Sequence, residues 1–177
     1  MIESIRTYFF EKEKNKHLRQ NAPAKVRFQR NRPNHYGILL DATNPDDRNT
    51  AIVFAEKLRK EGNRAKILGF VNGKMESIAL SFDVFTTADL AKISQVPKSP
   101  LAISFMEQSF DVLINLSIKQ NHKPLDYICA VSKAAFKVGP FYKNLEQNLY
   151  DLCIHVDEKS SLKSWINEVM HTLQKIY

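Results

Sequence analysis

The feature that most constrains the fold is an alternation of short apolar runs with longer amphipathic segments. It begins at Tyr36 and continues to the end of the chain. Strands separated by helical segments form βαβ units, whose strands lie parallel in one sheet. We therefore predict an α/β fold: a three-layer, doubly wound, Rossmann-like domain with a mainly parallel sheet of five or six strands. The apolar runs are YGILLDA, in which the strand ends at Asp41, and residues 65–71, 82–87, 110–117, 136–140 and 151–156.

The helical segments between these runs carry start signals of their own. Asn44 can accept hydrogen bonds from free backbone N–H groups, and Pro45 suits the first turn of a helix. Pro124 begins another helix, and the last helix begins at Ser160 or Ser161. Residues 87–108 can form either a helix or a loop, because Pro97 and Pro100 interrupt this segment.

The distribution of charge divides the chain at the same place. The net charge is +7, of which +6 lies in residues 1–35 and +1 in the other residues. Residues 2–20 can form a helix, and prolines bracket the connector that follows. We therefore predict a basic helical arm and connector over residues 1–35, and an α/β domain of nearly neutral charge over residues 36–177.

The arm has the composition of a polyanion-binding segment. From Lys14 to His35 there is no acid, and the bases alternate with amides, two histidines and Phe28. Cationic groups release counterions from a polyphosphate, and rings can stack on bases. We predict a contact with RNA or a ribonucleoprotein such as the ribosome, although a solvated basic helix would have the same composition. The predicted contact residues are Lys12, Lys14, Lys16, Arg19, Lys25, Arg27, Arg30 and Arg32.

An apolar stripe on the same helix offers a second kind of contact. Ile2, Ile5, Tyr8 and Phe9 fall on one helical face. This face could pack on the domain, on a protein partner or on a second copy of the chain. With the bases that follow, it could also lie on an anionic membrane surface.

A second basic group lies in the domain, around the helix that Pro124 begins. With Phe141 and Tyr142 it could form a basic and aromatic surface, although lysines scattered by chance would look the same. Its lysines are Lys119, Lys123, Lys133, Lys137 and Lys143.

The motifs for nucleotide and metal chemistry are missing from the sequence. The loop after the first strand reads DATNPDDR, without the glycines that let backbone approach a pyrophosphate, and there is no P-loop. We predict no nucleotide cofactor. Asp41, Asp46 and Asp47 could hold Mg²⁺, but Asp46 and Asp47 are explained as helix-start residues, so no metal site is predicted.

An enzymatic alternative places a small-molecule or sugar-acceptor site at the carboxyl ends of the strands, where such sheets bind ligands. Its weak catalytic candidates are Asp41, Asn115 and His155. No nucleophile elbow is present, and the five histidines form no sequence motif.

The sequence carries few signals of the cellular compartment of the protein. Cys129 and Cys153 each lie in an apolar run, without CxxC or zinc-type spacing, and suit buried, reduced thiols. The N-terminal residues lack the apolar core of a signal peptide, and no run is long enough to span a membrane. We expect a cytoplasmic protein without an integral membrane segment.

Two resemblances add to these predictions. Residues 110–141 resemble part of the acceptor-side domain of heptosyltransferase-type glycosyltransferases, through Asn115, the helix from Pro124, and Lys137-Val138-Gly139. The chain lacks that family's Gly-Asp loop and has no room for its second domain, so the likeness implies the fold and at most one half of such an enzyme. As a whole, the chain is similar to an uncharacterised bacterial family, a domain of unknown function, through its basic start, YGILLDAT and the 110–141 block. This implies a bacterial cytosolic protein and no particular activity.

Overall fold

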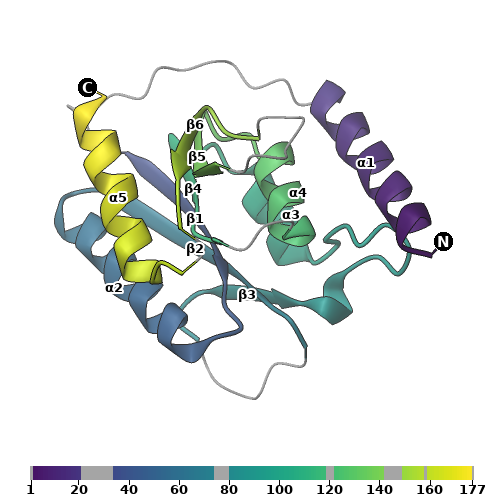
Figure 1. The fold of residues 1–177 in the computed structure, drawn as a ribbon, viewed down its shortest axis with the longest axis horizontal. Helices are drawn as coiled ribbons and strands as arrows, with labels where there is room; N and C mark the ends of the chain where they lie inside the picture. Colours follow the sequence, from purple (N-terminus) through teal and green to yellow (C-terminus); the bar gives the residue numbers. More distant parts are fainter. Residues whose placement is uncertain are drawn as a thin grey trace.

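The computed structural model describes residues 2–20, 34–73, 80–118, 122–141, 149–157 and 159–176. Their centre is a six-stranded sheet in the order β3-β2-β1-β4-β5-β6, in which every neighbouring pair is parallel (Figure 1). The predicted doubly wound α/β fold is thus confirmed, with six strands. They are β1 (His35–Asp41), β2 (Arg64–Val71), β3 (Asp83–Thr86), β4 (Val112–Asn115), β5 (Phe136–Phe141) and β6 (Leu152–His155).

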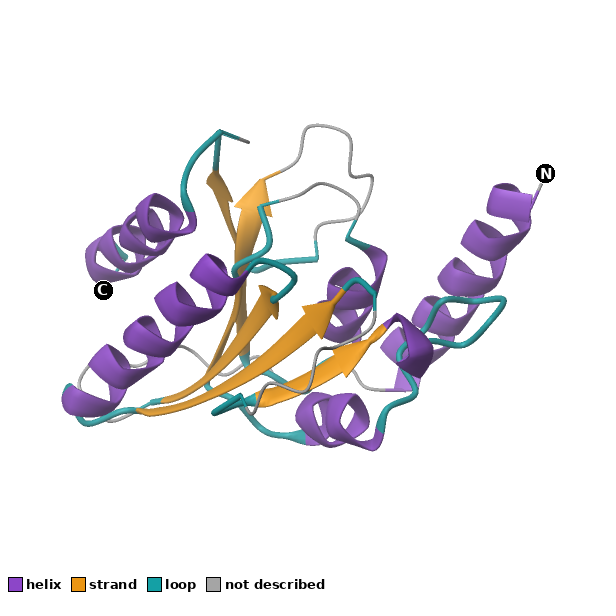
Figure 2. Ribbon diagram, turned by 90° about the horizontal axis from the view of Figure 1, so that it is seen from below, coloured by secondary structure: helices purple, strands orange, loops and turns teal. Residues whose placement is uncertain are grey.

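Helices cover both faces of this sheet. One layer holds α2 and α5, the opposite layer holds α3 and α4, and α1 lies outside α4 (Figures 1 and 2). No helix in the described part of the chain is both long and apolar enough to cross a membrane. The helices are α1 (Ile2–Gln20), α2 (Pro45–Lys60), α3 (Pro100–Glu107), α4 (Lys123–Val131) and α5 (Leu162–Lys175), with a short 3-10 turn η1 (Thr87–Asp89).

Local signals set several of the helix ends. The Asn44 side chain accepts a hydrogen bond from the backbone N–H of Asp46 at 2.9 Å and so caps α2 as predicted. Gly62 follows α2 with a φ of 86°, which glycine adopts without the clash a Cβ would cause. The segment left open by the sequence, 87–108, divides into η1 and α3, because Ser99 caps a new helix that Pro100 begins.

The apolar strands are buried on both faces, which explains why they lack polar alternation. Ile38 and Leu40 of β1 face a core cluster shared with α2 and α5. Leu39 between them faces the other cluster, shared with α3, α4 and Phe10 of α1. Each fully buried side chain of this size stabilises the fold by about 1.5–3 kcal/mol. The sheet is therefore a rigid platform that fixes the positions of the strand ends.

Candidate functional site

The strand order reverses between β1 and β4, and the carboxyl ends of these two strands are the place where sheets of this kind bind ligands. Asp41 ends β1, and His122 directly precedes α4 on the crossover from β4. His122 Nε2 lies 3.7 Å from Asp41 Oδ2. The sheet topology thus brings together an imidazole and a carboxylate from distant parts of the sequence.

The surroundings of this pair limit its motion. The side chains of His122 and Asp41 are only 11% and 14% exposed. The His122 ring meets Phe70 of β2 nearly edge-on, with ring centroids 5.2 Å apart, and Asp41 Oδ1 accepts a hydrogen bond from the Thr43 backbone N–H at 3.2 Å. His122 Nδ1 is shielded from solvent and has no hydrogen-bond partner among the described residues. A ring that rotates or shifts here can offer a polar atom to a bound molecule.

A cavity of about 600 Å³ opens beside this pair, and α1 forms one of its walls. Its polar lining includes Arg6, Asn72, Gln95 and His122. This volume is in the range of small-molecule sites in proteins. Within the described residues no group of histidine, cysteine, aspartate or glutamate side chains is placed to hold a metal ion.

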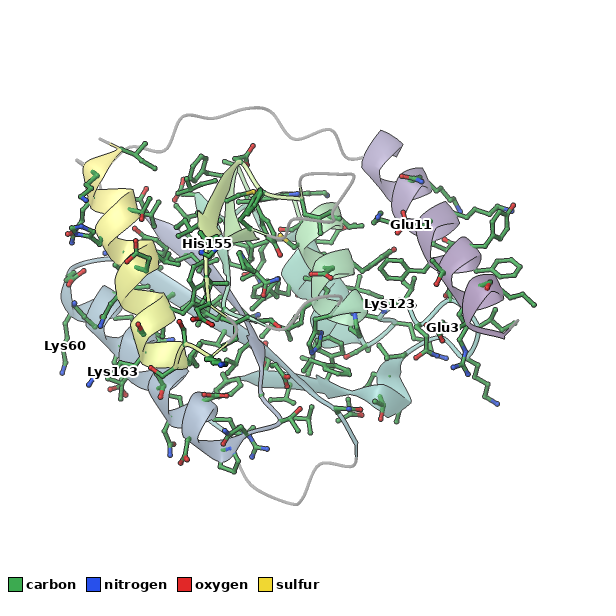
Figure 3. All side chains as sticks on the ribbon, viewed as in Figure 1. Glu3, Glu11, Lys60, Lys123, His155 and Lys163 are labelled. Atoms are coloured by element: carbon green, nitrogen blue, oxygen red, sulfur yellow. The ribbon has the colours of Figure 1, made fainter. Side chains whose placement is uncertain are left out.

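Lys123, the first residue of α4, lines this cavity and binds to α1. Its Nζ donates to Glu3 Oε1 at 2.6 Å and to Thr7 Oγ1 at 3.2 Å (Figure 3). The Lys123 ammonium lowers the pKa of the Glu3 carboxyl. The wall of the cavity that α1 forms is therefore held in part by polar contacts.

The three catalytic candidates from the sequence do not come together. Asn115 is fully buried: its Nδ2 donates to the Tyr150 hydroxyl at 2.8 Å, and its Oδ1 accepts from the Ser117 backbone N–H at 3.0 Å. His155 ends β6, three strands away from β1 in the sheet, and is exposed. None of the three lines the cavity, and Asp41 is linked to it through His122, which does.

Helix α1 docks on α4 through a face that the sequence did not indicate. Glu3, Thr7, Phe10 and Lys14 share this face, at helical spacing. Phe10 is buried, with its ring 5.8 Å from that of Tyr127 in α4. Lys14, predicted to contact RNA, is buried instead, because it packs over the Phe10 ring and pairs with Glu11 at 2.6 Å. Lys14 is therefore removed from the RNA-contacting set.

The predicted apolar stripe points to solvent. Ile5, Tyr8 and Phe9 are 49%, 63% and 38% exposed. Lys12 and Lys16 continue the same face at helical spacing and are exposed as well. The side chains of Ile2 and Arg19, and the residues Lys25, Arg27, Arg30 and Arg32, lie outside the described part of the structure. We name the described set, Ile5, Tyr8, Phe9, Lys12 and Lys16, the outer face of α1.

Within the described residues, three lysines of the second basic group form intramolecular contacts. Lys123 is bound to Glu3 and Thr7, and Lys133 pairs with Glu107 at 3.1 Å. Lys137 is buried and donates to the Ala130 carbonyl at 3.0 Å, and burial lowers its pKa. The described lysines of this group thus serve intramolecular contacts, and Lys119 and Lys143 lie outside the described residues.

Asp126 lies in the first turn of α4, on the side that meets α1. Burial raises the pKa of its carboxyl to about 6, although the nearby His122 and Lys14 act in the opposite direction. Cys129, also on α4, is fully buried, and burial raises its pKa to about 12, which suits an inert thiol.

Two of the residues that organise this region were not identified as such from the sequence: His122 was considered only as one of the bases around the helix that Pro124 begins, and Phe10 was not singled out. His122 could have been found once the strand order was known, because it follows β4, the neighbour of β1. Phe10 is one aromatic residue beside the more apolar stripe of Ile5, Tyr8 and Phe9, so no sequence signal distinguished it.

Comparison with known proteins adds a family assignment. The model of a family of unknown function, DUF6913, matches residues 6–176. No curated protein matches the chain significantly. The matched range includes most of α1 as well as the sheet domain.

Proposed function

This chain belongs to the family of unknown function DUF6913, and we propose that it is a non-catalytic α/β binding protein whose basic arm contacts RNA or a ribonucleoprotein such as the ribosome. The observation that carries this proposal is the outer face of α1, where the exposed aromatic side chains of Tyr8 and Phe9 are followed by the exposed lysines Lys12 and Lys16. The proposal places the protein in the bacterial cytoplasm.

The two faces of α1 support this division of labour. The face with Phe10 and Lys14 holds the helix against α4 and keeps its orientation fixed. The opposite face presents Tyr8 for stacking on an unpaired base, while Lys12 and Lys16 are placed to neutralise phosphates. A docked helix of this kind loses less conformational entropy on binding than a free basic tail.

The test uses point variants, because deletion of residues 1–35 would also strip Phe10 from its contact with Tyr127. Binding of fluorescein-labelled single-stranded RNA and of ribosomal RNA fragments is measured by anisotropy over a range of salt concentrations. Lys12→Ala with Lys16→Ala keeps the helix propensity and removes two cations. We expect affinity to fall at least tenfold and the salt slope to fall by about 1.4, at about 0.7 per phosphate contact.

Tyr8→Ala examines stacking separately. Loss of one base–aromatic stack is worth about 1–3 kcal/mol, so the affinity for single-stranded RNA should fall about fivefold to 150-fold. Lys60→Ala with Lys175→Ala is the matched control, since both are exposed lysines on helices of the opposite layer. Equal RNA affinity of the wild type and the two α1 variants would refute the proposal.

The same variants test two other partners for the outer face of α1. Sedimentation with anionic vesicles, without RNA binding, would favour the adaptor at a membrane surface. A dimer in light scattering that Tyr8→Ala converts to a monomer would favour a second copy of the chain as the partner of Ile5, Tyr8 and Phe9.

A second candidate function is a small-molecule site in the cavity that His122 lines, with Asp41 as the partner of His122. It is the sugar-acceptor alternative from the sequence, with His122 in place of Asn115 and His155. The imidazole held against a carboxylate, with a shielded Nδ1, is the observation that favours it. A panel of sugars and sugar phosphates would be screened by thermal shift. A stabilising compound should lose its effect in His122→Gln and keep it in His155→Gln, and equal loss in both variants would contradict this site.

A further inference from the structure

A groove between α2 and α5, on the layer opposite α1, is unrelated to either proposed site. Its volume is about 560 Å³, well within the range of small-molecule pockets. The floor is apolar and consists of the buried side chains of Phe54 and Ile166. Val53, which is 65% exposed, and Met170 extend this apolar lining toward solvent.

The side chains of this groove that carry a full charge, Lys57 and Lys163, are both basic. Lys57, Lys163 and His171 line it, and none of the residues that line it is acidic. Both lysines are exposed, and within the described part of the chain neither forms an ion pair. Asn49, Asn167 and Gln174 add amide groups to the lining.

The dimensions of the groove favour a single extended chain. Its lining runs from Asn49 to Lys57 along α2 and from Lys163 to Gln174 along α5. At 1.5 Å of rise per residue, these spans correspond to roughly 12 and 16 Å. An alkyl chain of medium length can lie along such a groove and exchange water for contacts with Phe54 and Ile166, at about 0.8 kcal/mol per buried methylene.

We infer that this groove binds a free anionic amphiphile: a single alkyl chain along the floor, with a carboxylate head group paired with Lys57 at one end of the rim or Lys163 at the other. The charge of the rim selects the head group, because a carboxylate gains a charge-assisted hydrogen bond from an ammonium group. A cationic head group would meet Lys57, Lys163 and His171 without a compensating acid. The apolar floor contributes affinity and the rim contributes selectivity.

The probe is laurate, used below its micelle-forming concentration at pH 7.5, with the full chain in isothermal titration calorimetry. We expect saturable binding of one laurate per chain. Dodecyltrimethylammonium, with the same chain length and the opposite head-group charge, should bind at least tenfold more weakly. Equal binding of the two probes, or no saturable binding of laurate, would overturn the inference.

Variants locate the site. Lys57→Glu with Lys163→Glu should weaken laurate binding at least tenfold. Lys60→Glu is the matched control, because Lys60 is an exposed lysine of α2 outside the groove lining, and it should change affinity less than threefold (Figure 3). Val53→Trp, at an exposed position, should block the chain without unfolding the protein, which circular dichroism checks. Unchanged laurate binding in the double variant and in Val53→Trp would place the ligand elsewhere and refute the site.

Other occupants of the groove give different results. An acidic amphipathic peptide that binds through Lys57 and Lys163, while laurate does not bind, would overturn the inference in favour of a protein partner. Sedimentation with anionic vesicles that depends on the same lysines, again without laurate binding, would overturn it in favour of a membrane surface. Loss of RNA binding in the α1 variants bears on neither result, so this inference and the proposed function fail separately.

Discussion

Replacement of Asp126 by Asn should stabilise the protein at neutral pH. Burial raises the pKa of this carboxyl to about 6 from its ordinary value of 3.8. No hydrogen bond to its side chain is present among the described residues. The nearby charges of Lys14 and His122 offset only part of the cost of burying a carboxylate. Asparagine has nearly the same shape and no charge, so it removes this cost.

The size of the effect follows from the pKa. A difference of about two pH units between folded and unfolded states corresponds to about 3 kcal/mol, at about 1.4 kcal/mol per unit. Below pH 4 the carboxyl is protonated in both states and costs nothing. As the pH rises from about 4 to about 6, the unfolded state releases its proton first, so the free energy of unfolding falls. Asp126→Asn should therefore gain up to about 3 kcal/mol at pH 7.5 and little at pH 4.

Urea unfolding of both proteins at pH 4 and pH 7.5 measures this difference, with the m-value as a check on two-state behaviour. The gain at pH 7.5 corresponds to a rise in Tm of about 6–12 °C for a domain of this size. Asp83→Asn is the control, since its half-exposed pair with Lys66 at 3.1 Å should be worth at most about 1 kcal/mol. A loss of stability in Asp126→Asn at pH 7.5, or the same change at both pH values, would refute the reasoning.

Three further substitutions examine the contacts that organise the fold. Tyr150→Phe removes the hydroxyl that accepts from Asn115 Nδ2 at 2.8 Å and should lower the free energy of unfolding in urea by about 1–3 kcal/mol. A decrease of less than about 0.5 kcal/mol would contradict a structural role for this hydrogen bond. Gly139→Ala places a Cβ in collision with the Tyr150 ring and should cost about 1–3 kcal/mol by the same assay. Wild-type stability would show that the Tyr150 ring moves freely. Phe10→Ala should speed amide hydrogen exchange throughout α1 while the sheet keeps its protection; unchanged exchange in α1 would show that polar contacts alone hold it.

The strands and most helices could be predicted because their signals are local. A strand buried on both faces is apolar at consecutive positions, as Val112, Leu113 and Ile114 are, and a cap such as Asn44 lies within two residues of the N–H that it binds. The concentration of charge in residues 1–35 is likewise a property of the sequence alone. These features need no knowledge of how distant segments pack.

The candidate sites depended on packing between distant segments. The sequence analysis grouped Asp41 with Asn115 and His155 because all three fall in strands or at strand ends, but the strand order places His155 three strands away. Asn115 bonds to Tyr150 instead of facing a ligand. His122 became the partner of Asp41 because β4 lies beside β1, a fact that the order of strands along the chain does not contain.

Periodicity, capping and net charge are properties of contiguous residues, so an α/β domain with its excess charge in a short arm could be predicted before the packing was known. Which face of α1 docks and which faces solvent follows from the packing of distant segments. The apolar stripe of Ile5, Tyr8 and Phe9 stays exposed, and the more polar face with Phe10 and Lys14 is the one that docks. The physical reason is that docking depends on the matching surface of α4, where Tyr127 and Lys123 meet Phe10, Glu3 and Thr7.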